Sequence, residues 1–391
     1  MQYGPGQWLT RALARSVHTM TKRVSRRDFL KSGLAAATVA ASGAALPRLA
    51  MAATDDELCT VLDVGKCIGC EACVEACREA WQSSTPDPVS PIPQPFPARV
   101  PIEDWSKRKD VQDRLTPYNF LYVEMLAVSH KGQEVEINIP RRCMHCRNAP
   151  CANLCPFGAA RVEGNGVVHI DGDLCLGGAK CKNVCPWKIP QRQSGVGLYL
   201  HLLPEYAGNG AMFKCHRCLP LVRQGQTPRC IEVCPEKVQA IGPRQEMVAA
   251  AAEMARAYAQ ADGRAADLWP EYVYGLEENG GTNTIYVAPV PFAAINQAMI
   301  AQHKEQARED IDAALSAGGG RGLGPGRGDG AGPELARFGR PSMGPQPDAM
   351  QSAKNLTWAL AIAPVAGLAA GLGKFLSSTK DKGLGEAGGK K

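Results

Sequence analysis

The chain has 391 residues, enough for two or three domains of ordinary size, and a formal net charge of +6 at pH 7. The excess positive charge lies at the start, since residues 1–52 hold eight Lys or Arg and one acidic residue. The rest has 36 basic (44 − 8) and 37 acidic (38 − 1) residues, a net charge of −1. Because nucleic-acid-binding proteins concentrate basic residues on their folded part, no nucleic-acid partner is expected.

Residues 1–52 have the features of a twin-arginine signal peptide. The segment SRRDFLK at residues 25–31 precedes an uncharged, weakly apolar run at 33–47, and Ala50 and Ala52 offer an A-x-A cleavage site. The alternative is a chance basic stretch before an Ala-rich helix, and Met20 is a second candidate start. The twin-arginine route carries folded proteins, so we expect the mature chain on the periplasmic side of the cytoplasmic membrane.

Residues 53–245 form the predicted cysteine-rich domain, which we expect to be of the α+β class. A Pro-rich stretch at 82–101 cannot form continuous helix or strand and predicts an ordered surface loop. Strand-like patterns follow at 121–128, 134–139 and 166–173. The segment 245–260 is rich in Ala, Met and Glu, which favours a helix.

Fifteen of the sixteen cysteines fall into four groups. The first has the spacing C-x2-C-x2-C-x3-C, typical of bacterial ferredoxins, in which three thiolates hold one cluster and the fourth binds its neighbour. Two-residue gaps let a loop curl so that thiolates and amide N–H groups both face a cube of iron and sulfur. The groups are Cys67, Cys70, Cys73, Cys77; Cys143, Cys146, Cys151, Cys155; Cys175, Cys181, Cys185; and Cys215, Cys218, Cys230, Cys234.

The other possible uses of these cysteines are disulfides, zinc sites and free structural thiols. Disulfides explain four dense groups poorly, and zinc explains C-x2-C pairs but not the third cysteine. Pro156, Pro186 and Pro235 directly follow the last cysteine of three groups, which is a further repeated feature. Four correlated motifs therefore favour iron-sulfur clusters.

The third group lacks one cysteine, because Gly178 stands where the second one is expected. We therefore expect three 4Fe-4S clusters and one 3Fe-4S cluster, or a fourth 4Fe-4S cluster with a non-cysteine ligand near Gly178. Cys59 lies outside the motifs and is interpreted as a buried small side chain.

The C-terminal part is divided by composition. Residues 246–315 are predicted to extend the soluble domain, and the Gly- and Pro-rich residues 316–354 to form a flexible linker. Residues 355–373 carry no charge and predict a single transmembrane helix, with a buried soluble helix as the alternative. The Lys-rich tail 374–391 places the C-terminus in the cytoplasm by the positive-inside rule.

Four such motifs in this order, over residues 58–245, resemble the four-cluster subunits of membrane-bound respiratory oxidoreductases. CMHCRNAPCANLCP and CIEVCPEKVQAIGPRQEM are most similar to HybA-type ferredoxin-like subunits of nickel-iron hydrogenases. The resemblance implies two ferredoxin-like dicluster modules, the second (143–185) nested in the first. It also implies one ligand set for each cluster: Cys67, Cys70, Cys73 and Cys234; Cys215, Cys218, Cys230 and Cys77; Cys143, Cys146, Cys151 and Cys185; and Cys175, Cys181 and Cys155.

The family's function, carried over, is a relay of single electrons through the clusters. The implied partners are a catalytic hydrogenase subunit and an integral membrane quinone-reactive subunit. The alternative is a molybdopterin enzyme such as formate dehydrogenase or a sulfur-compound or nitrate reductase. No catalytic residue is expected in this chain. Two functions of other classes remain as alternatives. If the chain were an enzyme in its own right, it would need a substrate pocket near Gly178. If it were an exported interaction module built on zinc sites, the purified protein would be colourless.

Overall fold

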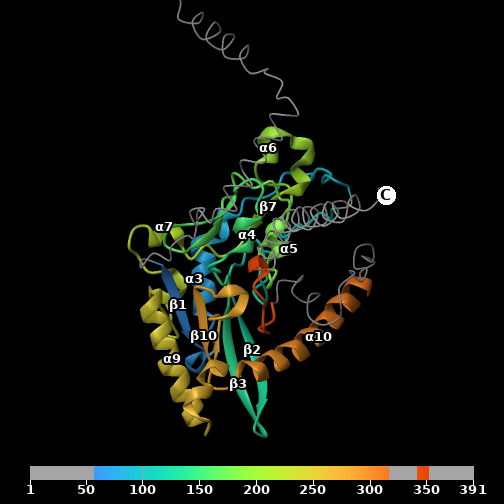
Figure 1. Cartoon of the computed structure of the whole chain (residues 1–391). Helices are drawn as coiled ribbons and strands as arrows, with labels where there is room; N and C mark the ends of the chain where they lie inside the picture. The colour runs from blue at the N-terminus through green and yellow to red at the C-terminus, as the bar shows by residue number, and fades with distance from the viewer. Residues whose placement is uncertain (1–56, 99, 317–340, 352–391) are drawn as a thin grey trace, which may run out of the picture. The chain divides into compact units, whose positions relative to one another are not determined.

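A computed structural model describes residues 57–98, 100–316 and 341–351, which all belong to one unit of the chain, Ala53–Lys391 (Figure 1). A four-stranded sheet in this unit joins segments far apart in the sequence. Its order is β8 (Gln239–Pro243), β1 (Leu58–Asp63), β10 (Thr284–Val287) and β9 (Val273–Tyr274). Strand β1 is parallel to β10 and antiparallel to β8, and β10 is antiparallel to β9.

Helix α9 (Arg244–Ala261) packs against this sheet, which confirms the helix expected at 245–260 (Figure 1). Ala251, Ala255 and Ala259 recur every fourth residue, and all three are fully buried. Their small side chains leave room for Cys59 and other residues of β1 and β10. Cys59 is therefore part of the packing between β1 and α9.

The long hairpin of β2 (Tyr122–His130) and β3 (Gln133–Arg141) confirms the two strands expected at 121–128 and 134–139. The expected strand at 166–173 is shorter, since only β5 (Val168–Ile170) forms and pairs with β4 (Ala160–Val162). It starts late because residues 163–167 make the turn between the two strands, where Gly166 has φ +77° and Gly166 N–H donates to the Glu163 carbonyl.

Short helices and loops make up most of the remaining fold. The α-helices are α3 (Ala72–Trp81), α4 (Pro150–Asn153), α5 (Lys180–Val184), α6 (Tyr199–Leu202), α7 (Leu219–Val222), α8 (Arg229–Glu232) and α10 (Phe292–Ser316). A further antiparallel pair joins β6 (Gln191–Gln193) and β7 (Ala211–Phe213), with residues 194–210 between them in the chain. The 3-10 turns are η2 (Val64–Lys66), η3 (Gln82–Ser84), η4 (Pro204–Asn209), η5 (Ala266–Tyr272) and η6 (Glu278–Gly280).

The Pro-rich stretch at 82–101 is an ordered loop, as expected. Apart from η3, its described residues form no helix or strand. Hydrogen bonds attach it to the rest of the fold: Val89 N–H donates to the Gly195 carbonyl at 3.0 Å, and Phe96 N–H to Asn209 Oδ1 at 2.9 Å.

The predicted flexible linker, 316–354, is wrong for residues 341–351, which pack on the domain. Met343 is 2% exposed, and the Pro341 carbonyl accepts a hydrogen bond from Arg141 Nη2 at 2.6 Å. The predicted signal peptide (1–52), transmembrane helix (355–373) and tail (374–391) lie outside the described residues. Within the described ranges, no helix combines the length and the apolar character that a membrane span requires.

Candidate metal centres

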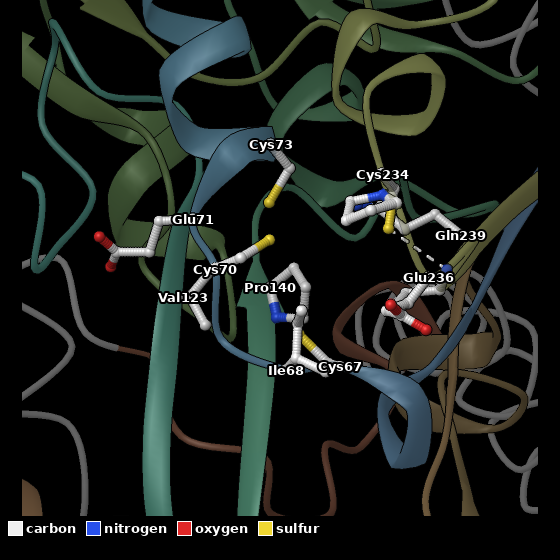
Figure 2. Close-up of a pocket in the computed structure, with 12 residues that line it drawn as sticks. Cys67, Ile68, Cys70, Glu71, Cys73, Val123, Pro140, Cys234, Glu236 and Gln239 are labelled. Carbon is white, nitrogen blue, oxygen red and sulfur yellow. Dashed lines mark hydrogen bonds between the residues drawn. The ribbon is translucent and has the colours of Figure 1, made fainter.

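Site A is the cavity surrounded by Cys67, Cys70, Cys73 and Cys234 (Figure 2). The first two cysteines lie on the loop between η2 and α3, and Cys73 lies in the first turn of α3. Cys234 comes from the loop after α8, more than 150 residues later in the chain. The structure therefore brings together four cysteines that the first and last motifs contribute.

Site B lies one helical turn away and is lined by Cys77, Cys215, Cys218 and Cys230. Cys73 and Cys77 are four residues apart on α3 and therefore lie on the same face of this helix. Cys73 contributes its sulfur to site A, and Cys77 contributes its sulfur to site B. Trp81, on the next turn, donates its Nε1–H to Cys218 Sγ at 3.1 Å.

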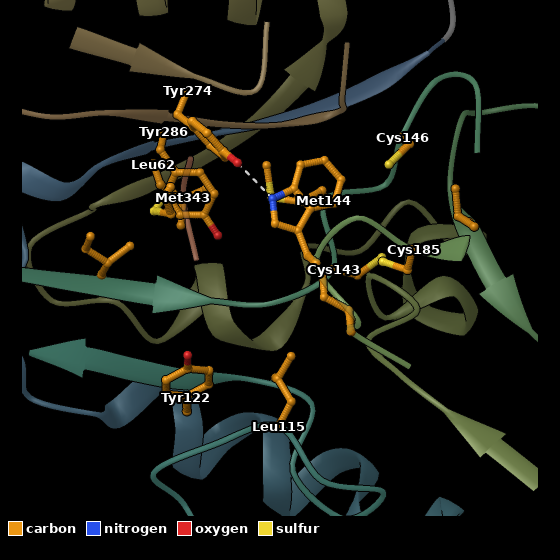
Figure 3. Packing of buried hydrophobic residues seen from close by; sticks show 14 of the residues in the cluster. Leu62, Leu115, Tyr122, Cys143, Met144, Cys146, Cys185, Tyr274, Tyr286 and Met343 are labelled. Carbon is orange, nitrogen blue, oxygen red and sulfur yellow. Dashed lines mark hydrogen bonds between the residues drawn. The ribbon is translucent and has the colours of Figure 1, made fainter. Parts of the chain in front are cut away.

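Site C is lined by Cys143, Cys146, Cys151 and Cys185, beside the buried core that Figure 3 shows. Trp187 forms part of its wall and donates Nε1–H to the Tyr274 hydroxyl at 2.8 Å. Three cavities that are each lined by four cysteines indicate three occupants with the same kind of ligand set.

Site D is formed by the remaining three cysteines, Cys155, Cys175 and Cys181. Burial raises the pKa of Cys175, and the Cys155 thiolate raises it further. The pKa of Cys181 is raised by burial, then by Cys175 and by Cys151 and Cys185 of site C, so Cys181 lies close to cysteines of both sites. Gly178 lies exposed on the loop between Cys175 and Cys181, and a Cβ built there meets no atom within 4 Å. Site D therefore has three cysteines, and no side chain stands at the loop position of the missing fourth one.

Two family models, both described as 4Fe-4S dicluster domains, match residues 66–159 and 135–244. The hydrogenase-2 operon protein HybA of Escherichia coli is 28% identical over 301 residues, covering 69% of this chain and 82% of that protein. The chain fits the HybA-type iron-sulfur proteins and their wider family.

Other relatives in this wider family have similar identity. The thiosulfate reductase electron transfer subunit PhsB of Salmonella typhi is 28% identical over 185 residues, covering 47% of this chain and 74% of PhsB. The iron-sulfur subunit of nitrate-inducible formate dehydrogenase of Escherichia coli is 27% identical over 240 residues, 59% of this chain and 68% of that subunit. The two dicluster domains and the cysteine sets support several 4Fe-4S clusters in this iron-sulfur protein.

The protonation of these buried cysteines depends on whether a metal is bound. Each of the sixteen is a free thiol, with no disulfide. Burial raises the pKa of Cys73 and Cys151 to about 12, and that of Cys185 and Cys218 to about 11, with nearby thiolates adding to the effect. Such thiols ionise only when a cation replaces the proton, which bound iron would do. In the described part of the chain, no three His, Cys, Asp or Glu side chains converge on one point that a single metal ion would occupy.

Buried hydrogen-bond donors also fit an anionic cluster. In the described structure, Arg142 Nη2, Arg217 Nε and Arg192 Nη1 are buried without a hydrogen-bond partner, whereas Arg192 Nε lies 3.7 Å from Glu103 Oε1. Arg142 and Arg217 line site B, and Arg192 lowers the pKa of Cys175 in site D. Since buried donors are nearly always paired, cluster sulfides would supply the missing acceptors.

Sequence reasoning noticed His145 in a cluster loop but missed the buried cations. His145 is fully buried, and its Nε2 lies 3.9 Å from Cys215 Sγ of site B, although His145 itself stands between two cysteines of site C. Burial and nearby cations hold its pKa well below the usual range. Lys214 is also buried; burial lowers its pKa, but three thiolates together raise it above its ordinary value. The signal available in the sequence was a basic residue directly before Cys143 and before Cys215.

Proposed function

We propose that the chain relays single electrons through four clusters, three of the 4Fe-4S type at sites A, B and C and one 3Fe-4S cluster at site D. The observation that carries this proposal is the set of three cavities that are each lined by four cysteines. Helix α3 links sites A and B, and helix α5 with its C-cap residue Cys185 links sites C and D, since Cys181 lies in the helix. Neighbouring redox centres held on short rigid segments favour electron transfer and need no catalytic side chain.

The partners we propose are a periplasmic catalytic subunit, foremost a nickel-iron hydrogenase, and a membrane subunit that reacts with quinone. Similarity to HybA supports the hydrogenase. Similarity to a formate dehydrogenase subunit and to PhsB supports the alternative, a molybdopterin oxidoreductase. Iron bound at these sites would supply the electron-accepting chemistry, while the chain supplies the thiolates, the N–H donors and the exclusion of water.

The first test is iron and sulfide analysis with EPR on the anaerobically purified chain. We expect about fifteen irons per chain, four in each of three clusters and three in the fourth. A 3Fe-4S signal in the oxidised protein and 4Fe-4S signals after dithionite are also expected. In membranes that contain the chain, hydrogen should reduce the clusters if the partner is a hydrogenase, and formate if it is the alternative enzyme. Zinc in place of iron would overturn the relay.

We propose that the chain reaches the periplasmic side of the membrane by the twin-arginine route and is anchored there by residues 355–373. The double variant Arg26→Lys/Arg27→Lys of this chain is expected to remain inside the cell with its clusters bound, because the twin-arginine route recognises the arginine pair. Fractionation and iron analysis measure this. Lys22→Gln/Arg23→Gln removes two nearby charges outside the pair and is expected to be exported normally. Normal export of the Arg26/Arg27 variant would refute the assignment.

A further inference from the structure

Two buried cations cross between the two modules. Arg142 directly precedes Cys143 of site C, yet its side chain lines site B, where Nη1 donates to Cys230 Sγ at 2.9 Å. Lys214 directly precedes Cys215 of site B, yet its side chain lines site C. The main chain of each residue therefore lies next to a cysteine of one site, while its charged side chain lines the other site.

Both side chains are held firmly in these positions. Arg142 is 4% exposed and Lys214 is 6% exposed. Lys214 Nζ donates to the Val168 carbonyl at 2.5 Å and to the Cys215 carbonyl at 3.0 Å, so its stem bridges from the site B loop to the site C wall. Such buried charges act through a low local dielectric and are weakly screened by salt.

The loops that carry the two cations are also close to each other. His145, on the site C loop, lies 3.9 Å through Nε2 from Cys215 Sγ of site B, and its Nδ1 accepts a hydrogen bond from Val168 N–H at 3.0 Å. Sites B and C therefore meet here, and an electron passing between the modules would cross at this contact.

We infer that Arg142 and Lys214 are a crossed pair of positioning residues that sets the potentials of the clusters at sites B and C, and with them the electron step between the modules. This inference rests on the proposed relay. A positive charge stabilises the reduced form of a cluster, which carries one more negative charge, and so raises its potential. Each cation acts on the cluster of the other module. Loss of either cation alone would therefore change the difference between the two redox potentials.

The test is an anaerobic redox titration of the full chain followed by EPR. Cys218→Ser and Cys146→Ser variants identify the signals of sites B and C. Arg142→Gln is expected to lower the potential of the site B cluster, and Lys214→Gln that of the site C cluster. The ratio of electrons held by the clusters at sites B and C should change by roughly tenfold or more, in opposite directions for the two variants, because each removes a buried charge beside one cluster. The double variant should restore the ratio.

Controls separate this charge effect from other causes. Arg142→Lys and Lys214→Arg keep the charge and should leave the ratio close to that of the native protein. Arg223→Gln removes an exposed cation that pairs with Glu163 and should change neither potential. The inference is overturned if Arg142→Gln shifts the site C cluster instead, or if charge-keeping and charge-removing variants behave alike, including a common loss of clusters. Failure of the relay itself would appear differently, as the absence of cluster signals in the unaltered chain.

Discussion

Gly178→Cys is expected to convert the cluster at site D from the 3Fe-4S to the 4Fe-4S type. A thiolate would then stand at the open corner beside Cys175 and Cys181, and the fourth iron would have its ligand. The backbone permits this change, because an added Cβ at Gly178 meets nothing within 4 Å and its φ is not in the left-handed region. EPR should show loss of the oxidised 3Fe-4S signal, and iron analysis a gain of about one iron per chain.

Two glycine variants control for the effect of a side chain alone. Gly178→Ala adds the same Cβ without a ligand and should keep the 3Fe-4S signal. Gly177→Ala, one residue earlier, should disrupt the loop, because Gly177 has φ +62° and its Cβ would lie 2.1 Å from the Asn209 carbonyl oxygen. A 3Fe-4S signal that persists unchanged in the Gly178→Cys protein would show that position 178 does not face the missing iron.

Glu124→Gln is expected to destabilise the folded protein by roughly 3–5 kcal/mol at neutral pH, because it breaks a buried ionic cluster. Glu124 is 4% exposed on β2. Its Oε1 lies 2.6 Å from His303 Nε2 of α10, its Oε2 accepts from the Tyr122 hydroxyl at 2.6 Å, and Arg141 Nη1 lies 3.8 Å away. Guanidinium unfolding of the anaerobic holoprotein, followed by cluster absorbance, measures the loss.

The same carboxylate predicts a dependence on pH. Burial raises the pKa of Glu124, but the hydrogen bond with His303, the nearby charges and the Tyr122 hydroxyl lower it more, so the net shift is downward. Its contribution to stability is therefore complete above the unfolded-state pKa of about 4.3 and is lost as the pH falls through the lower folded-state pKa. The deficit of Glu124→Gln should shrink over that acidic range. Glu134→Gln, on the exposed end of β3, should cost almost nothing; an equal loss in both variants would contradict the argument.

Local patterns in the sequence predicted the elements whose contacts are local. The hairpin of β2 and β3 alternates apolar and polar residues, and the Ala-rich helix at 245–260 follows from propensity alone. Strand β10 was not predicted, because the short run TIYV gains its partner, β1, from more than 200 residues earlier in the chain. Residues 341–351 were assigned to a linker for the same reason, since their composition does not reveal their contacts with Arg141 and Tyr274.

The metal centres follow a similar division. The spacing of the cysteines indicated the four groups and the vacant position at Gly178, and the family resemblance supplied the pairing of motifs around each cavity. The crossed positions of Arg142 and Lys214 could not be predicted, because a side chain adjacent to one site in sequence extends to the other only through the tertiary fold.

The parallel pairing of β1 with β10 has a consequence for synthesis of the chain. A ribosome that has released Cys67, Cys70 and Cys73 has supplied three of the four sulfurs of site A, and the fourth, Cys234, follows after about 160 further residues. The strand that completes the pairing of β1 follows later still, at Thr284–Val287. With the cluster proposed for site A, iron loading of this site would be completed only after Cys234 has been translated, when more than half of the chain has been made.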